Sequence, residues 1–209
     1  QHIGTPLRTA ITTLDRAAGR REACAAFGLD ADKPTVLVFG GSQGARSINR
    51  AAAGSAAALT EAGFQVLHAA GAGNVDEVRA AVGDRPSYVV VPYLERMDLA
   101  YAAADVAVCR SGAMTCTELA AVGMPAVYVP LPHGNGEQRF NALPVVQAGG
   151  GVLVDDAALT PSVLVNTVTP LLRDPERLKA MSVAASGLGR RDGDLALARL
   201  VLAVAKGTR

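Results

Sequence analysis

Short runs of apolar and β-branched residues recur along the chain, separated by longer stretches rich in alanine and leucine. The short runs predict strands at 35–39, 65–69, 88–91, 106–109, 126–129 and 152–154. The longer stretches predict helices near 47–62, 74–82, 96–103, 113–122 and 137–148. Strand and helix in alternation are typical of βαβ units, whose right-handed crossovers give a parallel sheet with helices on both faces. We therefore expect an α/β fold with a Rossmann-like, doubly wound parallel sheet.

The pattern changes after about residue 160, where no further strand is predicted. C-terminal helices are expected there at 161–172, 175–185 and 194–205, the first two with a proline near the helix start. We expect residues 9–160 to form one domain and the helices of 161–209 to pack on it; for the last helix, a neighbour outside the chain is the alternative. Residues 1–8 contain glycine and proline, so we expect a linker remnant from a longer protein, with a processed terminus as the alternative.

Composition narrows the classes of partner. Of 209 residues, 50% are hydrophobic but only 4% aromatic, which favours buried parallel strands over a base-stacking sheet. The 20 basic and 19 acidic residues leave a net charge of +1, so no nucleic-acid partner is expected. Three scattered cysteines are too few for a disulfide framework or a zinc site and indicate a reducing compartment. The most apolar stretch, 195–205, is shorter than the roughly 20 residues of a membrane span, so we expect a soluble chain, with contact to a membrane surface left open. With the reducing compartment, this favours a cytoplasmic location.

Candidate chemistry lies in the segments that follow the strands, because ligands of open parallel sheets bind at the carboxyl ends of the strands. The first strand is followed by Gly40-Gly41-Ser42-Gln43-Gly44-Ala45. Glycines let the backbone approach a ligand closely, and the next helix offers free N–H groups to an anion or a polar sugar edge. The segment matches neither the GxGxxG of dinucleotide sites nor the GK[ST] of a phosphate-binding P-loop. An ordinary tight turn is the alternative.

The fourth strand leads into Cys109-Arg110-Ser111-Gly112-Ala113-Met114-Thr115-Cys116-Thr117-Glu118. Ser111 is a candidate cap of the next helix, and the glycine after it removes side-chain bulk at the helix mouth. The unpaired backbone amides of Ala113, Met114 and Thr115 would form a cradle for a diphosphate. By spacing, Ser111, Thr115 and Glu118 share one helix face, which suits the Glu118 carboxylate to a ribose diol. The alternative makes Ser111 an ordinary cap and Glu118 a surface charge.

The fifth strand leads into a polar loop and a helix whose first turn carries Glu137, Gln138 and Asn141. Carboxylate and amide side chains at a loop mouth suit sugar hydroxyls, and a solvated helix start is the alternative. His133 in the loop is a candidate ligand contact, but it has no evident nucleophile or carboxylate partner that would make it a catalytic base. The sequence contains no catalytic-triad or metal-binding motif, so no metal is expected.

Three of these segments, in this order and spacing, resemble the MurG family. They are Gly-Gly-Ser-Gln-Gly-Ala at 40–45, Arg-Ser-Gly-Ala-Met-Thr-Cys-Thr-Glu at 110–118 and Glu-Gln-Arg-Phe-Asn-Ala at 137–142. Members of this family transfer N-acetylglucosamine from its UDP donor to a lipid-linked muramoyl-pentapeptide in peptidoglycan synthesis. They have the GT-B architecture, in which two Rossmann-like domains face each other across a cleft. The resemblance runs over essentially the whole chain, but it covers only the carboxyl half of the family's enzymes. Residues 3–8 resemble the Gly-Asn-Pro-x-Arg segment at the junction of the halves.

The resemblance implies that this chain is the half that binds UDP-N-acetylglucosamine, without a cofactor. Ser42 and Gln43 would meet the diphosphate and sugar, and Arg8 would reach towards the same region. The backbone of Leu94 would read the uracil edge. Backbone amides at the start of the helix near 113 would hold the phosphates, and Glu118 would hold the ribose.

The sugar would be held by Glu137 and Gln138, with Asn141 in support. Two departures from the family pattern leave its phosphate and ribose contacts in place. A common form has Gln-Gln where this chain has Glu137-Gln138, and Thr5 replaces the asparagine of Gly-Asn-Pro. The candidate substrate-binding residues are Arg8, Gly41, Ser42, Gln43, Gly44, Leu94, Arg110, Ser111, Gly112, Ala113, Met114, Thr115, Glu118, His133, Glu137, Gln138 and Asn141.

The resemblance places the catalytic base, the acceptor site and the membrane-facing patch on an amino-terminal half, which this chain lacks. We therefore expect donor binding without turnover from this chain alone, and a complete enzyme that is peripheral on the cytoplasmic face of the plasma membrane. Alternatives are the donor subunit of a split transferase, a transferase of specialised metabolites and half of a UDP-sugar epimerase. An NAD-dependent oxidoreductase shares the fold class, but GxGxxG is missing and no acidic residue ends the second strand.

Overall fold

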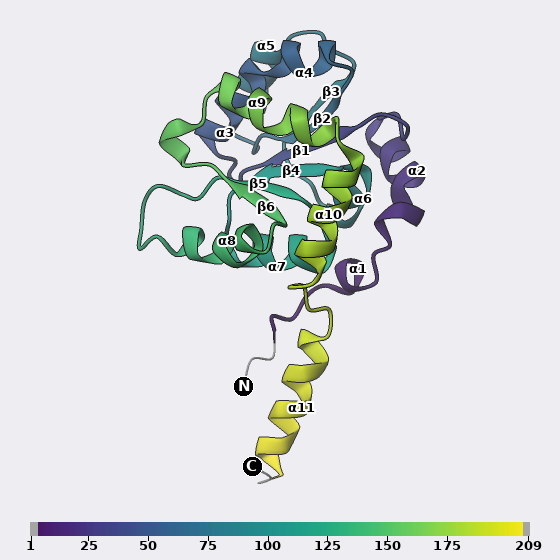
Figure 1. Cartoon of the computed structure of the whole chain (residues 1–209), viewed down its shortest axis with the longest axis vertical. Helices are drawn as coiled ribbons and strands as arrows, with labels where there is room; N and C mark the ends of the chain where they lie inside the picture. The colour runs from purple at the N-terminus through teal and green to yellow at the C-terminus, as the bar shows by residue number, and fades with distance from the viewer. Residues whose placement is uncertain (1–3, 207–209) are drawn as a thin grey trace.

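A six-stranded parallel sheet forms the centre of the computed structural model, which describes residues 4–206 (Figure 1). Its strand order is β3-β2-β1-β4-β5-β6, so the order reverses between β1 and β4 as in doubly wound folds. The predicted α/β fold is confirmed. The strands are β1 (Thr35–Phe39), β2 (Gln65–Ala69), β3 (Tyr88–Val91), β4 (Val106–Cys109), β5 (Ala126–Tyr128) and β6 (Gly151–Leu153).

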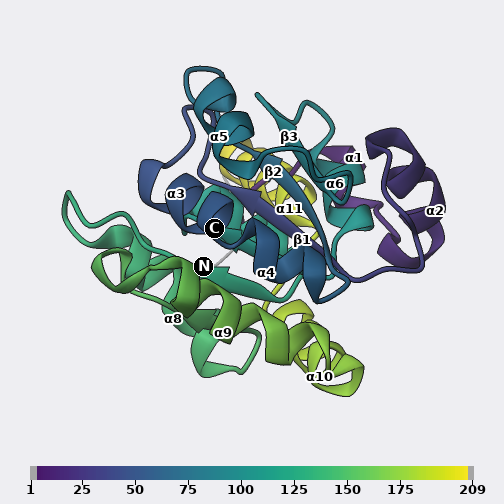
Figure 2. The ribbon, with the colours of Figure 1, turned by 90° about the horizontal axis from the view of Figure 1, so that it is seen from above.

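Helices cover both faces of the sheet. Alternate residues of β1 separate into two cores: Val36 and Val38 pack with α3, α4 and α9, whereas Leu37 and Phe39 pack with α2, α6 and α7. Figure 2 shows α2 beside α6 at one end of the molecule and α8, α9 and α10 in a row along one side. The helices are α1 (Thr9–Thr12), α2 (Arg16–Phe27), α3 (Arg46–Gly54), α4 (Ala56–Glu61), α5 (Val75–Val82), α6 (Met97–Ala103), α7 (Ala113–Ala121), α8 (Glu137–Gln147), the 3₁₀ turn η1 (Asp156–Ala158), α9 (Pro161–Leu172), α10 (Pro175–Ser186) and α11 (Gly193–Ala205).

Two features of the helices differ from the prediction. The single helix expected at 47–62 is divided into α3 and α4 at Ser55, whose hydroxyl donates to the carbonyls of Ala51 and Pro161. The helices α1 and α2 were not predicted, although the ends of α2 carry ordinary signals. Asp15 caps its first turn by accepting from the Ala18 amide, and Gly28 ends it with a φ of 68°.

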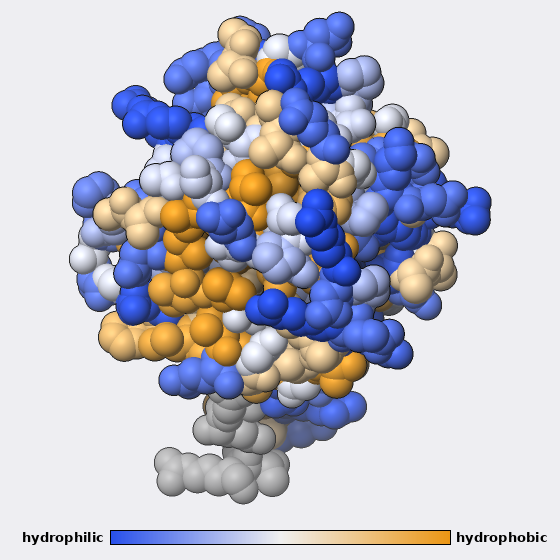
Figure 3. Space-filling model, turned by 45° about the horizontal axis from the view of Figure 1, so that its top comes forward, coloured by the Kyte–Doolittle hydropathy of each residue, from blue (hydrophilic) through white to orange (hydrophobic). Residues whose placement is uncertain are grey.

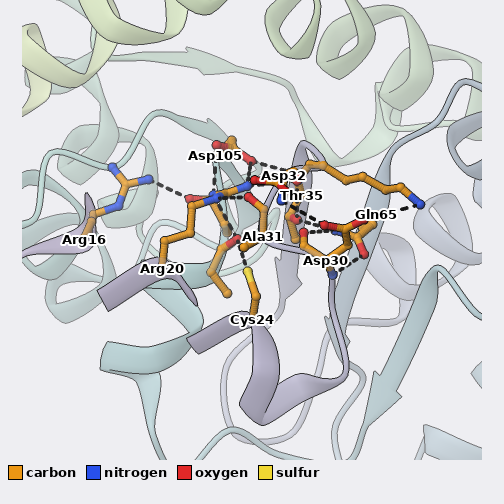
Figure 4. A network of polar contacts seen from close by, with 12 residues as sticks. Arg16, Arg20, Cys24, Asp30, Ala31, Asp32, Thr35, Gln65 and Asp105 are labelled. Atoms are coloured by element: carbon orange, nitrogen blue, oxygen red, sulfur yellow. Dashed lines mark hydrogen bonds and ion pairs between the residues drawn. The ribbon is translucent and has the colours of Figure 1, made fainter. Parts of the chain in front are cut away.

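A polar network fixes α2 to the amino-terminal ends of the strands, which we call the amino edge of the sheet (Figure 4). The carboxyl ends of the strands lie on the opposite side. Arg20 donates two hydrogen bonds of 3.1 Å to Asp105, which also accepts from the Thr35 amide at 2.7 Å. Arg16 donates to three backbone carbonyls, those of Tyr101, Ala104 and Gly123. These contacts join α2, β1 and the start of β4, so this edge is held by structural interactions.

The carboxyl-terminal helices behave differently from one another. The buried residues of α9 and α10 belong to the two cores, whereas Gly193 is the one buried residue of α11. Figure 1 shows α11 extending away from the body of the domain, on the side where the chain begins. Apart from Gly193, the described residues of α11 are not buried against the sheet domain, and the packing of residues 161–209 on that domain stays a prediction for this helix. Figure 3 shows apolar side chains gathered left of the centre and down to the lower left of this face, with polar side chains prevailing on its right.

Residues 4–8 of the predicted linker have no regular secondary structure and lead into α1, and residues 1–3 of that segment lie outside the described residues. Within residues 4–206, no helix has the length and apolarity needed to cross a bilayer.

Candidate ligand-binding site at the strand ends

A cavity of about 150 Å³ lies at the carboxyl ends of β1 and β2, and we call it the strand-end cavity. The loops after β1 and β3 and the helices α6 and α7 complete its walls. It is lined by Phe39, Gly41, Ser42, Ala69, Tyr93, Leu94, Met97, Tyr101, Met114, Thr115 and Glu118. Six of the predicted site residues therefore share one cavity: Gly41, Ser42, Leu94, Met114, Thr115 and Glu118.

Two of the three glycines in the loop after β1, Gly41 and Gly44, have different structural roles. Gly41 has a φ of +90°, and a Cβ added there would meet no atom within 4 Å. Gly44 has a φ of +73°, and its Cβ would lie 2.0 Å from the Ala70 carbonyl oxygen. Gly44 therefore serves a close approach between two loops of this chain. Gln43 is exposed, and its carbonyl accepts from the Asn74 side chain at 3.1 Å. Neither Gln43 nor Gly44 lines the strand-end cavity.

The start of α7 is open towards the cavity. Gly112 is the N-cap residue, with an extended backbone and no side chain to cap the helix. The amides of Ala113, Met114 and Thr115 belong to the first turn, where no intrahelical acceptor is available. Ser111 is not the cap that was predicted, because the helix begins one residue too late for it. Its hydroxyl is buried and has no hydrogen-bond partner among the described residues.

Glu118 is a buried carboxylate in the wall of this cavity, with 8% of the residue exposed. The surface-charge alternative for Glu118 is therefore wrong. Tyr101 donates to its Oε2 at 2.8 Å, and Arg8 Nη2 donates to its Oε1 at 3.3 Å. Burial and the nearby Glu118 charge raise the pKa of Tyr101 well above its usual value, so the phenol keeps its proton. Arg8, predicted to reach this region, does so through Glu118.

The loop after β3 contributes Leu94 to the cavity wall. Leu94 is 4% exposed and lines the cavity. Neither its amide nor its carbonyl forms a hydrogen bond within the part of the chain that the structure describes. A buried amide and carbonyl with free hydrogen-bonding capacity suit a flat ligand edge that carries both donors and acceptors.

Two of the predicted sugar-binding residues of α8, Gln138 and Asn141, bind the backbone of Ser111. Gln138 Oε1 accepts from the amides of Ser111 and Leu131 at 3.2 and 3.0 Å, and Asn141 donates to the Ser111 carbonyl at 3.1 Å. Glu137 is exposed at the helix start, and His133 is exposed in the preceding loop. These residues do not line the strand-end cavity. Asn141 instead lines a separate cavity of about 500 Å³ beside α7.

The guanidinium of Arg110 has partners inside the protein. It donates to Asp156 at 2.5 Å, to the Ser47 hydroxyl at 3.0 Å and to the carbonyls of Val129 and Pro130 at 3.1 Å. It therefore connects the ends of β4 and β5 with α3 and η1, and it does not line the strand-end cavity.

Sequence reasoning missed four large side chains of the cavity wall: Phe39, Tyr93, Met97 and Tyr101. Phe39 ends a predicted strand, and Met97 and Tyr101 are one turn apart on α6. The available signal was this i, i+4 pair after the third strand, which marks one helix face. Nothing in the sequence distinguished a face towards a cavity from a face towards the core.

The cavity combines an uncapped helix start, a buried carboxylate and an apolar wall. An uncapped helix N-terminus attracts anions, and a carboxylate accepts hydrogen bonds from hydroxyls. Residues 4–206 contain no group of three or more His, Cys, Asp or Glu side chains that could hold a metal ion. The geometry suits a ligand with a phosphate, a diol and a flat ring.

Comparison with known proteins agrees with this description. The family model of the glycosyltransferase family 28 C-terminal domain matches residues 35–195. A relative from Rhodococcus jostii is 59% identical over 207 residues, which cover 99% of this chain and 54% of the relative. A relative from Acidothermus cellulolyticus is 59% identical over 203 residues, 95% of this chain and 55% of the relative. Both are named UDP-N-acetylglucosamine–N-acetylmuramyl-(pentapeptide) pyrophosphoryl-undecaprenol N-acetylglucosamine transferase. The chain thus spans about half the length of these curated relatives.

Solved structures show the same architecture. The crystal structure of Acinetobacter baumannii MurG is similar with a TM-score of 0.76 and 29% identity, over 92% of this chain and 54% of that chain. The UDP-GlcNAc 2-epimerase of Neisseria meningitidis, bound to UDP-GlcNAc, has a TM-score of 0.62 over 87% of this chain and 48% of that chain. At 15% identity, the second likeness shows the fold alone.

Proposed function

The chain belongs to the family of glycosyltransferase family 28 C-terminal domains, and from this membership we propose that it is the donor-binding half of an inverting N-acetylglucosaminyltransferase of peptidoglycan synthesis. The donor is UDP-N-acetylglucosamine and the acceptor a lipid-linked muramoyl-pentapeptide. The observation that carries the proposal is the buried Glu118 in one cavity with the uncapped start of α7. The names of the relatives, at 59% identity, support the choice of donor and acceptor.

In this proposal, UDP occupies the strand-end cavity. The diphosphate lies at the amides of Ala113, Met114 and Thr115, with Ser42 beside it. The Glu118 carboxylate accepts from the ribose diol, and the backbone of Leu94 pairs with the uracil edge. As the glycosidic bond breaks, negative charge grows on the leaving UDP. The positive end of α7 stabilises that charge, which lowers the barrier without a metal ion.

The N-acetylglucosamine group lies towards α8. The Oε1 atom of Gln138 is engaged with two backbone amides, so the Gln138 NH₂ group is the part that is free for a sugar hydroxyl. Glu137 is exposed, and in this proposal its carboxylate accepts a hydrogen bond from a sugar hydroxyl. Asn141 supports both by holding the Ser111 carbonyl. We assign Gln43 and His133 to the rim of the site, and Gly44 and Arg110 to its support.

The acceptor site and the catalytic base belong to an amino-terminal half. Support comes from the relatives, which are about twice as long as the matched region. In this proposal residues 1–8 are a linker remnant, residues 9–160 form the donor domain, and the exposed apolar side chains of α11 pack against the amino-terminal half. Because the acceptor named for the relatives carries undecaprenol, we place the complete enzyme peripherally at the cytoplasmic membrane surface.

Calorimetric titration of the chain with UDP tests the proposal. We expect saturable binding that weakens at least about thirtyfold in Glu118→Ala, because two hydrogen bonds to a charged group are lost. The matched control is Glu61→Ala, which removes an exposed carboxylate on α4 outside the cavity and leaves UDP binding unchanged. Absence of UDP binding, or equal binding by Glu118→Ala, contradicts the proposal.

A second titration separates the sugar from the nucleotide. Glu137→Ala is expected to weaken UDP-N-acetylglucosamine about tenfold and to leave UDP unchanged, since Glu137 lies outside the strand-end cavity. Equal losses for both ligands would remove Glu137 from the sugar site.

A further inference from the structure

The hydrogen bond between Tyr101 and Glu118 joins α6 to α7 within the lining of the strand-end cavity. We propose that Tyr101 is a positioning residue that fixes the Glu118 carboxylate for the ribose diol and thereby sets a preference for ribonucleotides over 2′-deoxyribonucleotides. This inference rests on the proposed function and deepens it, because it concerns how the same site recognises the sugar of the nucleotide.

The number of free acceptor positions on Glu118 fits a diol. An ionised carboxylate offers about four lone-pair positions. Tyr101 uses one on Oε2, at 2.8 Å, and Arg8 uses one on Oε1, at 3.3 Å. About two positions remain, which is the number that a 2′,3′-diol requires.

Tyr101 also fixes the orientation of the Glu118 carboxylate. The last torsion of a glutamate side chain has broad minima, so a carboxylate without a fixed partner samples many orientations. Tyr101 is only 1% exposed, and its ring contacts Phe39 with centroids 6.5 Å apart and planes inclined by 59°. The phenol is thus held in place, and its hydroxyl holds Oε2 before any ligand arrives. The raised pKa of Tyr101 keeps the hydroxyl protonated and therefore a donor.

Arg8 cannot supply this orientation to the same degree. Its side chain is 58% exposed, against 10% for that of Glu118. An ion pair with one exposed partner holds its geometry weakly, because the exposed side chain is solvated and mobile. Tyr101 is the buried partner that persists when Arg8 moves away.

The test is the ratio of affinities for UDP and 2′-deoxy-UDP, measured by calorimetry on the wild-type chain and on Tyr101→Phe. We expect the wild type to prefer UDP by at least about tenfold, and Tyr101→Phe to prefer it by less than about threefold. The loss should fall on UDP, with 2′-deoxy-UDP little affected. Merely structural damage would weaken both ligands together and leave the ratio unchanged.

A matched control removes a tyrosine hydroxyl outside the cavity. Tyr88→Phe removes a buried hydroxyl that contacts His68. This variant should keep the wild-type ratio. In a Glu118→Ala background, Tyr101→Phe should cause no further change in the ratio, because its effect passes through the carboxylate.

The outcomes distinguish failure of the proposed function from failure of this inference alone. If the wild type does not bind UDP, the proposed function fails and this inference fails with it. If the wild type binds UDP and Tyr101→Phe keeps the full ratio, the inference alone is overturned. Should Tyr101→Phe not fold, NMR of the wild-type Tyr101 hydroxyl proton decides: protection from exchange that persists at saturating UDP supports the inference, and loss of protection overturns it.

Discussion

At the scale of single residues, His68 shows how a polar side chain is accommodated inside the sheet. It is fully buried on β2, with Nδ1 at 2.9 Å from the Tyr88 hydroxyl and Nε2 at 3.0 Å from Asn49 Oδ1. Asn49 donates its amide to the Ala70 carbonyl, so its oxygen faces the imidazole as an acceptor. Burial raises the pKa of the Tyr88 phenol, which therefore remains a donor. A neutral imidazole with its proton on Nε2 satisfies every partner.

The stability of the domain should consequently fall in weak acid. Burial lowers the pKa of His68 from 6.5 to about 4, so between these values the unfolded chain binds a proton that the folded chain does not. The stabilisation is complete above pH 6.5 and decreases as the pH falls towards 4, by about 2 kcal/mol between pH 7.5 and pH 5. Urea unfolding at the two pH values measures it. His68→Gln, which cannot titrate, should show a loss smaller by about that amount; an equal loss would contradict the assignment.

The glycines of the loop after β1 give a second test at this scale. Gly41→Ala adds a methyl in open space and costs about 1–2 kcal/mol of backbone strain at positive φ. Gly44→Ala places the methyl 2.0 Å from the backbone oxygen of Ala70, so the two loops must separate. We expect a loss of unfolding free energy of more than about 3 kcal/mol for Gly44→Ala. Thermal unfolding of both variants checks the order, and the reverse order would show that the loop is held differently.

At the scale of elements, the open start of α7 allows stability and binding to be changed in opposite directions. Ala113→Asp puts a carboxylate at the exposed first residue of the helix, where it stabilises the helix dipole by about 0.3–1 kcal/mol. The same charge repels a diphosphate, so UDP should bind at least about tenfold more weakly while uridine is unaffected. The neutral control is Ala113→Asn. If the affinities for UDP and uridine fell equally, the diphosphate would not lie at the start of α7.

The elements also show what the sequence can predict. The strands were found because they are short, mainly apolar runs, fully buried in β1, β2, β4 and β5 and half-buried for the most part in β3 and β6, and the parallel order followed from their alternation with helices. The break at Ser55 was not found, because it depends on a hydrogen bond to Pro161, which is distant in sequence. Glu118 stood out as an acid in an apolar helix, whereas the internal role of Arg110 depends on Asp156, which the sequence does not connect to it. Local sequence patterns could be predicted, whereas contacts between residues distant in sequence could not.

At the scale of the whole molecule, the amino-terminal and the carboxyl-terminal ends of the strands have different roles. The amino edge is held by Arg16, Arg20 and Asp105, which bind one another or backbone carbonyls. The carboxyl edge keeps free backbone donors at α7 and an accessible cavity. Beyond both edges, α11 exposes Leu195, Val201, Leu202 and Val204 by 57–72%. Exposed apolar side chains gathered on one helix are typical of an interaction surface, and we proposed the amino-terminal half as the partner of α11.

If α11 packs on the amino-terminal half, as proposed, its apolar residues matter only when that half is present. The double change Val201→Glu and Val204→Glu should leave the thermal midpoint of this 209-residue chain within about 1 °C, because α11 contributes to neither core. In a protein that contains both halves, the same change should lower the midpoint by at least about 4 °C and weaken transfer activity, since two charges enter an apolar interface. Val183→Glu, at an exposed valine of α10, is the matched control and should alter neither protein. Equal destabilisation of the short chain would mean that α11 folds back onto the sheet domain. In that case the apolar helix would be part of the donor domain, and the contact between the two halves would have to be formed by other surfaces.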